Sequence, residues 1–177
     1  MKRVEIIYGG ASNEKEISYL TAKSIYEHID TDLYNSGLTD LSKFDPDNFD
    51  NETIFFIAVH GEGGEDGKIQ TQLENKKRKF TGSSSESCIL TWDKVATKRA
   101  LIANDILTPQ FKSIKNNEHF DFNDSFFTEN EHYFVKPNFN GSSYGISKVS
   151  DKKFNEALKE AKKYSTEVII EKSFNGP

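Results

Sequence analysis

The chain has 177 residues, of which 35% are hydrophobic and 29% charged, and its formal net charge is −5. This composition is typical of a globular chain, and the length allows one large domain or two small ones. An acidic balance without a basic block argues against nucleic acid as the main partner. Cys88 is the only cysteine, so no internal disulfide can form, and a reducing compartment fits best.

The amino terminus and the apolar runs bear on localisation. Residues 1–8 begin with a basic pair, but the apolar run is short and is interrupted by Glu5, unlike a secretory signal. No run approaches the ~18 apolar residues of a membrane-spanning helix. We therefore expect a cytoplasmic protein without a membrane partner.

The first half of the chain predicts an α/β arrangement with a parallel sheet. Residues 4–8 predict a buried strand, and residues 54–59 are an apolar run without alternation, which is typical of a strand covered on both faces. Gly9-Gly10 ends the first run, and Asn13 with Glu16 predicts a helix N-cap with a capping box. The helix is expected to bury a stripe of residues at helical spacing, namely Ile17, Leu20, Ile25 and Ile29.

Both predicted strands end in polar loops that contain glycine, and ligands of such sheets bind beyond the carboxyl ends of the strands. Glu14 would lie in the first helical turn, where the helix dipole favours an ionised carboxylate that could hold a substrate ammonium. His60 would follow the second strand and could bind or orient a carboxylate. Taken alone, Glu14 and His60 are each explained at least as well by a structural role. Residues 62–66 resemble metal ligands in composition, but their glycines favour a turn before a helix over residues 68–76.

The second half predicts an α+β arrangement with a mostly antiparallel sheet. Asp93 is expected to cap a helix that runs to about Asn104, and residues 112–131 are expected to form a surface connection. The remaining predicted elements are a hairpin whose strands span residues 132–136 and 145–149, an amphipathic helix over residues 151–164 and a last strand over residues 167–172. The buried face of that helix would consist of Phe154, Ala157, Leu158, Ala161 and Tyr164.

The segment between the two hairpin strands is the most informative in the chain. An apolar strand ends at Lys136, Pro137 follows, and residues 141–143 form a Gly-Ser-Ser loop. Successive backbone N–H groups in such a loop can form an anion-binding concavity, so a fixed lysine beside it could hold a polyphosphate. A long hairpin turn explains the same residues equally well. Lys94 and Lys98 share one helix face, for which solvation is the ordinary explanation.

Taken together, these segments resemble the D-alanine–D-alanine ligases of the ATP-grasp superfamily. The match runs in order through Gly9 to Ser18, His60 to Gly67, Phe80-Thr81-Gly82-Ser83 followed by Asp93-Lys94, Val135-Lys136-Pro137 with Gly141-Ser142-Ser143, Ile170-Glu171-Lys172 and Gly176-Pro177. It implies a Rossmann-like, pre-ATP-grasp domain that binds substrate over residues 1–88, and a first ATP-grasp lobe over residues 89–177. A Rossmann-type oxidoreductase would need G-x-G-x-x-G, which residues 9–14 do not provide.

The resemblance implies an ATP-dependent ligase that joins two D-alanine molecules for peptidoglycan synthesis, cell-wall biogenesis and cell shape. ATP would phosphorylate the carboxylate of one D-alanine, and the amine of the second would attack the acyl phosphate. Mg²⁺ or Mn²⁺ would accompany ATP, and the protein would form a homodimer through its amino-terminal domain. Ligases that make D-alanine–D-lactate or D-alanine–D-serine, and a non-catalytic binding module, remain alternatives.

The resemblance also implies roles for single residues. Glu14 would bind the ammonium of the first D-alanine, His60 would lie near its carboxylate, and Ser142 would join a hydrogen-bond network with Glu14. Glu14 and Ser142 are therefore the expected catalytic residues. The expected ATP-binding residues are Lys94, Lys136, Gly141, Ser142, Ser143, Glu171 and Lys172, with the last two at the adenine.

Two features depart from the family pattern. Residues 138–140 read Asn-Phe-Asn, where charged residues are expected. Members of the family also continue well past this length, so the resemblance implies a chain truncated before the catalytic region that supplies the metal ligands. The 177-residue chain alone is therefore expected to be inactive.

Overall fold

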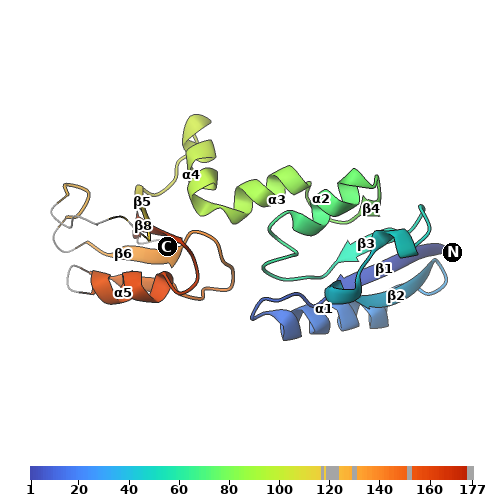
Figure 1. Cartoon of the computed structure of the whole chain (residues 1–177). Coiled ribbons are helices and arrows are strands. Elements are labelled where there is room, and N and C mark those ends of the chain that lie inside the picture. Colours follow the sequence, from blue (N-terminus) through green and yellow to red (C-terminus); the bar gives the residue numbers. More distant parts are fainter. Residues whose placement is uncertain (117, 119–123, 129–130, 151–152, 175–177) are drawn as a thin grey trace. The chain divides into compact units, whose positions relative to one another are not determined.

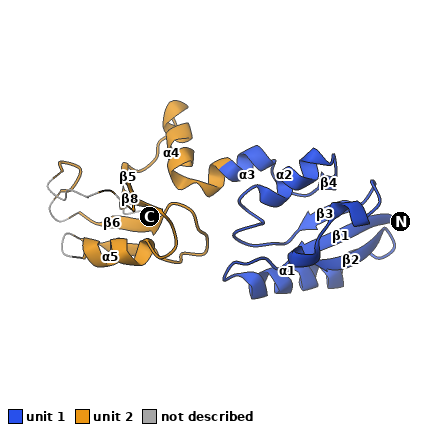
Figure 2. Ribbon diagram, in the orientation of Figure 1, with its two compact units in different colours: residues 1–89 blue, residues 90–177 orange. Residues whose placement is uncertain are grey.

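The computed structural model describes residues 1–116, 118, 124–128, 131–150 and 153–174. The chain divides into two compact units, Met1–Ile89 and Leu90–Pro177 (Figures 1 and 2). Each unit has its own sheet and its own hydrophobic core. Within the described ranges, no helix is both long enough and apolar enough to span a membrane.

Unit 1 contains a parallel sheet, as the unalternated apolar run predicts. Its strands lie in the order β2-β1-β3-β4, and all neighbouring pairs are parallel. The elements, in chain order, are β1 (Lys2–Tyr8), α1 (Lys15–His28), β2 (Tyr34–Asp40), the 3₁₀ turns η1 (Leu41–Lys43) and η2 (Pro46–Asn48), β3 (Ile54–Ile57), α2 (Lys68–Asn75) and β4 (Lys79–Phe80). The helix α3 (Ser85–Trp92) begins in unit 1 and ends in unit 2.

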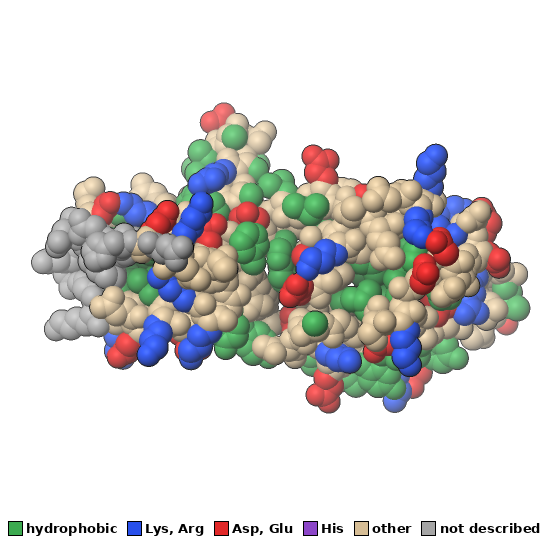
Figure 3. Space-filling view, viewed as in Figure 1, with side chains coloured by type: hydrophobic (Ala, Val, Ile, Leu, Met, Phe, Trp, Pro, Cys, Tyr) green, Lys and Arg blue, Asp and Glu red, His purple; other side chains and the backbone are tan. Residues whose placement is uncertain are grey.

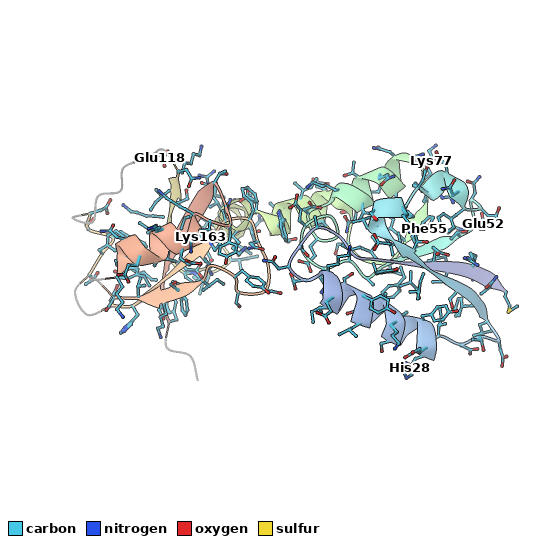
Figure 4. The ribbon with its side chains drawn as sticks, turned by 60° about the horizontal axis from the view of Figure 1, so that its bottom comes forward. His28, Glu52, Phe55, Lys77, Glu118 and Lys163 are labelled. Carbon is cyan, nitrogen blue, oxygen red and sulfur yellow. The ribbon has the colours of Figure 1, made fainter. Side chains whose placement is uncertain are left out.

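Helices cover both faces of this sheet. Val4 and Ile6 pack with Ala22 of α1 on one face, whereas Ile7 and Phe55 pack with Leu73 of α2 on the other. Successive residues of a strand point to opposite faces, so β1 supplies apolar side chains to both layers. Figure 4 shows Phe55 among the side chains of the unit 1 interior, and His28 at the carboxyl end of α1.

Two predictions for α1 are wrong. The N-cap is Glu14 rather than Asn13, and its side chain makes no capping hydrogen bond, so the capping box with Glu16 does not form. The reason is that Ser12 organises this turn: its hydroxyl accepts from Glu14 N, and its carbonyl accepts from Lys15 N.

The expected buried stripe of α1 is also only half correct. Ile17 and Leu20 are 52% and 53% exposed, while the fully covered positions of the helix are Ser18 and Ala22. Ser18 is buried because its hydroxyl accepts from Gly9 N and donates to the carbonyl of Ala58, which ties α1 to the ends of β1 and β3. Ser18 and Ala22 therefore face the sheet together with Ile25 and Ile29, whereas Ile17 and Leu20 face outward.

Unit 2 contains an antiparallel sheet in the order β5-β8-β6-β7, as the hairpin pattern predicts. The elements are α4 (Lys94–Ala103), β5 (Phe111–Lys115), β6 (Tyr133–Pro137), β7 (Ser147–Val149), α5 (Phe154–Ala161) and β8 (Glu167–Lys172). The predicted cap of α4 is confirmed, because the Asp93 carboxylate accepts from Ala96 N at 2.9 Å.

The core of unit 2 lies between α5 and one face of the sheet. Phe154, Ala157, Leu158 and Ala161 are buried there, as predicted, whereas Tyr164 is 36% exposed. Residues 151–152, where the helix was expected to begin, lie outside the described residues. The surface connection expected at residues 112–131 is wrong in part: residues 111–115 form strand β5, and Phe126 and Phe127 pack against the core.

Candidate functional site

In unit 1, the residues of interest lie where β1 and β3 end side by side. The Ser12 hydroxyl donates to the His60 carbonyl at 2.8 Å, which joins the loop after β1 to the loop after β3. The His60 ring nitrogen Nε2 lies 3.0 Å from Thr21 Oγ1 on α1, so the imidazole has a fixed orientation. These loops lie at the edge of a parallel sheet where ligands ordinarily bind.

Glu14 lies against the same loop. A Cβ atom at Gly61 would lie 3.2 Å from Glu14 Oε2 and 3.0 Å from Ser12 Cβ, and Gly61 has φ +71°. Glycine therefore lets the backbone next to His60 approach the Glu14 carboxylate closely. The structure thus brings Glu14 and His60 to one edge of the sheet, with the carboxylate at the amino-terminal end of α1, where the helix dipole favours an anion.

In unit 2, charged residues line the sheet face opposite the α5 core. Val168 and Ile170 of β8 point into that core. Side chains alternate along a strand, so Ile169 and Glu171 point to the other face. Lys136 of β6 pairs with Ile169, two residues before Glu171, which makes Lys136 and Glu171 a diagonal cross-strand pair. The alternating pattern of β6 and β8 therefore dictates this juxtaposition.

Glu171 is the centre of this charged group. Its Oε1 forms an ion pair with Lys136 Nζ, and its Oε2 lies 3.0 Å from Lys98 Nζ of α4. The carboxylate side chain is only 13% exposed, and that of Lys98 only 8%. Two ammonium groups on one carboxylate leave one positive charge in excess, which suits an anionic ligand.

Lys94 lies one helical turn before Lys98 and is partly buried. Its ammonium donates to the carbonyls of Asn138 and Asn140, at 3.2 and 2.7 Å. Burial, together with the nearby Lys136 ammonium, lowers the pKa of Lys94 from 10.5. An anionic ligand beside these two lysines would relieve both effects, because it would solvate and neutralise the ammonium groups.

The buried Asn138 fixes the amino terminus of α4 to the end of β6. Its side-chain oxygen accepts from Val95 N at 2.8 Å, and its amide nitrogen donates to Asp93 Oδ1 at 2.9 Å and to Glu167 Oε2 at 3.2 Å. A residue type that seemed out of place in the sequence therefore holds Lys94 beside the Gly-Ser loop.

The loop itself has an unusual backbone. Ser142 and Ser143 have φ of +50° and +62°, a left-handed conformation that residues other than glycine rarely adopt. Gly145 has φ +72°, and a Cβ atom there would lie 2.6 Å from the Tyr164 ring and 2.9 Å from Pro137. Consecutive strained residues in a loop beside Lys94 are typical of a site that holds a ligand.

Not every predicted site residue joins these groups. Glu14 and Ser142 lie in different units, and each is placed only within its own unit. The side chain of Lys172 points away from Glu171 and pairs with Glu131 at 3.1 Å. Gly176 and Pro177 lie outside the described residues. Among the residues that are described, no group of three or more His, Cys, Asp or Glu could hold a metal ion.

Comparisons with known proteins agree with this geometry. The family model for the D-ala D-ala ligase C-terminus matches residues 102–177. D-Alanine–D-alanine ligase of Marinomonas sp. (strain MWYL1) is 34% identical, with 98% of this chain and 57% of that protein covered. D-Alanine–D-alanine ligase B of Clostridium perfringens (strain 13 / Type A) is 35% identical, with 98% and 58% covered.

A solved structure also matches this chain and is likewise a D-alanine–D-alanine ligase. The chain matches the crystal structure of D-alanine–D-alanine ligase from Bacillus anthracis complexed with ATP, with a TM-score of 0.87, 28% identity, 99% of this chain covered and 60% of that one. The chain is similar to D-alanine–D-alanine ligases along nearly its whole length. It spans slightly more than half the length of the curated relatives it matches. The family's ATP-grasp fold explains why a parallel unit is followed by an antiparallel one.

Two residues that support the site could not be assigned from the sequence. The sequence predicts a solvated lysine at position 98, but Lys98 is buried. The family pattern predicts a charged residue at position 138, but the buried Asn138 anchors α4. For Lys98, a signal was available: it lies on the same helix face as Lys94, which the family resemblance already placed at the site.

Proposed function

We propose that the protein containing this chain is an ATP-dependent ligase that joins two D-alanine molecules. The observation that carries the proposal is the group of Lys94, Lys98 and Lys136 around Glu171, next to the left-handed Gly-Ser loop. This arrangement suits a polyphosphate, since lysines act as point charges and a loop offers backbone N–H groups. The relatives named as ligases support the choice of reaction.

The reaction has two steps. A carboxylate oxygen of the first D-alanine attacks the γ-phosphorus of ATP, the bond to ADP breaks, and an acyl phosphate forms. The amine of the second D-alanine then attacks the acyl carbon, a proton leaves the nitrogen, and phosphate departs with the former carboxylate oxygen. A carboxylate is a poor electrophile, so the enzyme's task is to position the reactants and stabilise the negative charge that spreads over the phosphoryl group.

Unit 1 would bind the first D-alanine. Glu14 would pair with its ammonium, and His60, held by Thr21, would donate to its carboxylate or orient it. The Glu14 carboxylate lies over Gly61, so both groups act at the same sheet edge. A neutral amide at position 14 would retain the shape but lose the ion pair.

Unit 2 would bind ATP. Lys94 and Lys136 would contact its phosphates, and the loop of Gly141, Ser142 and Ser143 would close over them. Glu171 and Lys172 would lie at the adenine. For Lys172 the proposal rests on its backbone carbonyl, because its N–H donates to the Gln110 carbonyl and its side chain pairs with Glu131.

Mg²⁺ or Mn²⁺ would accompany ATP as its counter-ion. The residues that the structure describes do not offer a carboxylate and histidine cluster suited to it. The roles assigned to this chain are therefore binding and orientation of the substrate and the nucleotide.

The proposal includes a homodimer formed through unit 1. Figure 3 shows hydrophobic side chains gathered along the lower side of unit 1, over α1. The residues concerned are 43–53% exposed and lie on α1: Ile17, Tyr19, Leu20 and Tyr26. An apolar helix face of this kind is commonly covered by a partner. A partner on this face would also account for the exposure of Ile17 and Leu20, while Ile25 and Ile29 of the same helix pack against the sheet core.

An assay of the full-length gene product tests the reaction. ADP release would be measured with D-alanine alone, and with D-alanine plus D-lactate or D-serine, and the products would be separated by mass. The proposal expects ADP release that depends on D-alanine and an equal amount of D-alanyl-D-alanine. Preference for D-lactate or D-serine would identify a related ligase instead. ATP binding without any ligated product would indicate a binding module.

A further inference from the structure

Lys98 is the most deeply buried lysine of the described residues, with 6% of its surface exposed. It lies on α4, and its ammonium contacts three groups: Glu171 Oε2 at 3.0 Å, Thr108 Oγ1 at 2.6 Å and the face of the Phe111 ring at 5.3 Å. A buried ammonium is costly unless it is paired, so this position is built to keep a positive charge.

Glu171 links this buried charge to Lys136. One carboxylate oxygen holds Lys98 and the other holds Lys136, so the two lysines share a single anion. Phe111 is the cross-strand neighbour of Glu171 and Phe134 is its neighbour on the other side, so apolar rings flank the carboxylate. Water has little access to Glu171, and its charge must be balanced by the lysines themselves.

The two lysines differ in exposure. The side chain of Lys136 is 21% exposed and that of Lys98 only 8%, so Lys136 alone can turn toward a ligand. If Lys136 were the only partner of Glu171, its movement to a phosphate would leave a largely buried carboxylate unpaired. Such an unpaired charge is strongly unfavourable. With Lys98 in place, Glu171 keeps a counter-ion throughout.

We propose that Lys98 is a positioning residue for the nucleotide site: it retains Glu171 as an ion pair, so that Lys136 is free to bind a phosphate group. This inference rests on the proposed function, because it assumes that Lys136 contacts a nucleotide. Lys98 itself touches no ligand, and its effect passes through Glu171. It differs from Lys94, which lies beside the Gly-Ser loop and would contact the phosphates directly.

A double-mutant cycle tests this role by calorimetric titration of the full-length protein with ATP and Mg²⁺. Lys98→Met removes the charge, Glu171→Gln removes its partner, and both changes are combined. We expect Lys98→Met to weaken ATP binding about tenfold in the wild-type background, a difference of about 1.4 kcal/mol. In the Glu171→Gln background, Lys98→Met should change the affinity for ATP less than about twofold. The reason is that Lys136 then has no ion pair with residue 171 that must break before it binds a phosphate.

Matched variants separate positioning from other effects. Lys98→Arg keeps the charge and should bind ATP within about threefold of wild type. Arg99→Met removes one positive charge from the exposed face of the same helix and should not change affinity, since exposed charges are screened. If Lys98→Met does not fold, Lys98→Gln takes its place in the cycle, because its amide can still bond to Thr108.

The outcomes are distinct. Equal loss of affinity on Lys98→Met in both backgrounds would show a merely structural residue and overturn the inference, as would unchanged affinity in the wild-type background. Absence of ATP binding by the wild-type protein would overturn the proposed nucleotide site, and with it the inference. Wild-type binding combined with a failed cycle would leave the proposed function standing and reject only the role of Lys98.

Discussion

Asn138 offers the sharpest test of how unit 2 is held together. Its side chain has 0% exposure and makes three hydrogen bonds, with Val95 N, Asp93 Oδ1 and Glu167 Oε2. Asn138→Ala leaves the buried Val95 N–H without an acceptor, at a cost of about 1–3 kcal/mol. It also removes two donors from ionised carboxylates, but both are partly exposed, so water can replace much of that bonding. We expect the free energy of unfolding to fall by about 3 kcal/mol.

Urea denaturation followed by tryptophan fluorescence measures this change. Trp92 is the only tryptophan, and it immediately precedes the Asp93 cap that Asn138 holds. The same substitution at the exposed Asn155 of α5 is the control, and it should shift stability by less than about 0.5 kcal/mol. A loss below about 1 kcal/mol for Asn138→Ala would refute the claim that this amide anchors α4.

Three further predictions concern the site, pH and assembly. Glu14→Gln and Lys136→Ala should each lower kcat/KM at least about a hundredfold in the full-length protein, since each removes a charge opposite a charged substrate group. Hydrogen bonds from the hydroxyl and backbone N–H of Ser42 lower the pKa of Asp40 below 3.8, so its contribution to stability is complete above that pH and disappears as pH falls through the lowered folded-state value. Asp40→Asn should therefore reduce the melting temperature at pH 7 but not near pH 2. Leu20→Glu places a charge on the exposed apolar face of α1 and should shift the protein from dimer to monomer in sedimentation velocity.

Each of these predictions has a control and a contrary outcome. Glu27→Gln alters an exposed carboxylate of α1 whose only described ion pair is a surface contact with Lys23, and it should leave kcat/KM unchanged. Near-normal turnover in Glu14→Gln would remove that residue from the substrate site. An equal melting-temperature difference at pH 7 and pH 2 would show that the charge of Asp40 is not what stabilises the turn. A Leu20→Glu protein that remains dimeric would place the interface elsewhere.

The positions of β1, β3, β6, β7 and β8 and the type of each sheet could be predicted because they depend on local patterns, whereas β2 and β4 were not predicted. The unalternated run of β3 and the hairpin around Lys136 both specify their sheets without reference to distant residues. The strand β5 could not be predicted in this way. Three of the five residues in its sequence, Phe-Lys-Ser-Ile-Lys, are polar, and it forms a strand because β8 pairs with it along its length.

The α1 helix shows a different limit. Periodicity correctly indicates a helix but not which face meets the sheet, because Ser18 and Ala22 are covered while Ile17 and Leu20 are exposed. The tie from the Ser18 hydroxyl to the ends of two strands decides the rotation of the helix. A hydrogen bond between residues 40 positions apart leaves no trace in local hydropathy.

At the site, too, some residues could be assigned from the sequence and others only from tertiary contacts. Lys136 and Glu171 could be assigned by resemblance, and the alternation of β6 and β8 places them on one face. The burial of Lys98 depends on its contacts with Glu171, Thr108 and the Phe111 ring, which no spacing in the chain specifies. Charge alone predicts a solvated lysine, and only the tertiary contacts with Glu171 and Thr108 reverse that expectation.

The central claim is that a D-alanine carboxylate becomes an acyl phosphate before the peptide bond forms. The direct measurement uses D-alanine labelled with ¹⁸O in its carboxylate, together with ATP and the full-length protein, and follows the label by mass spectrometry. The account predicts one ¹⁸O atom in each inorganic phosphate released with the dipeptide, because the leaving phosphate takes that oxygen. Dipeptide formation with unlabelled phosphate, or phosphate release without dipeptide, would contradict it.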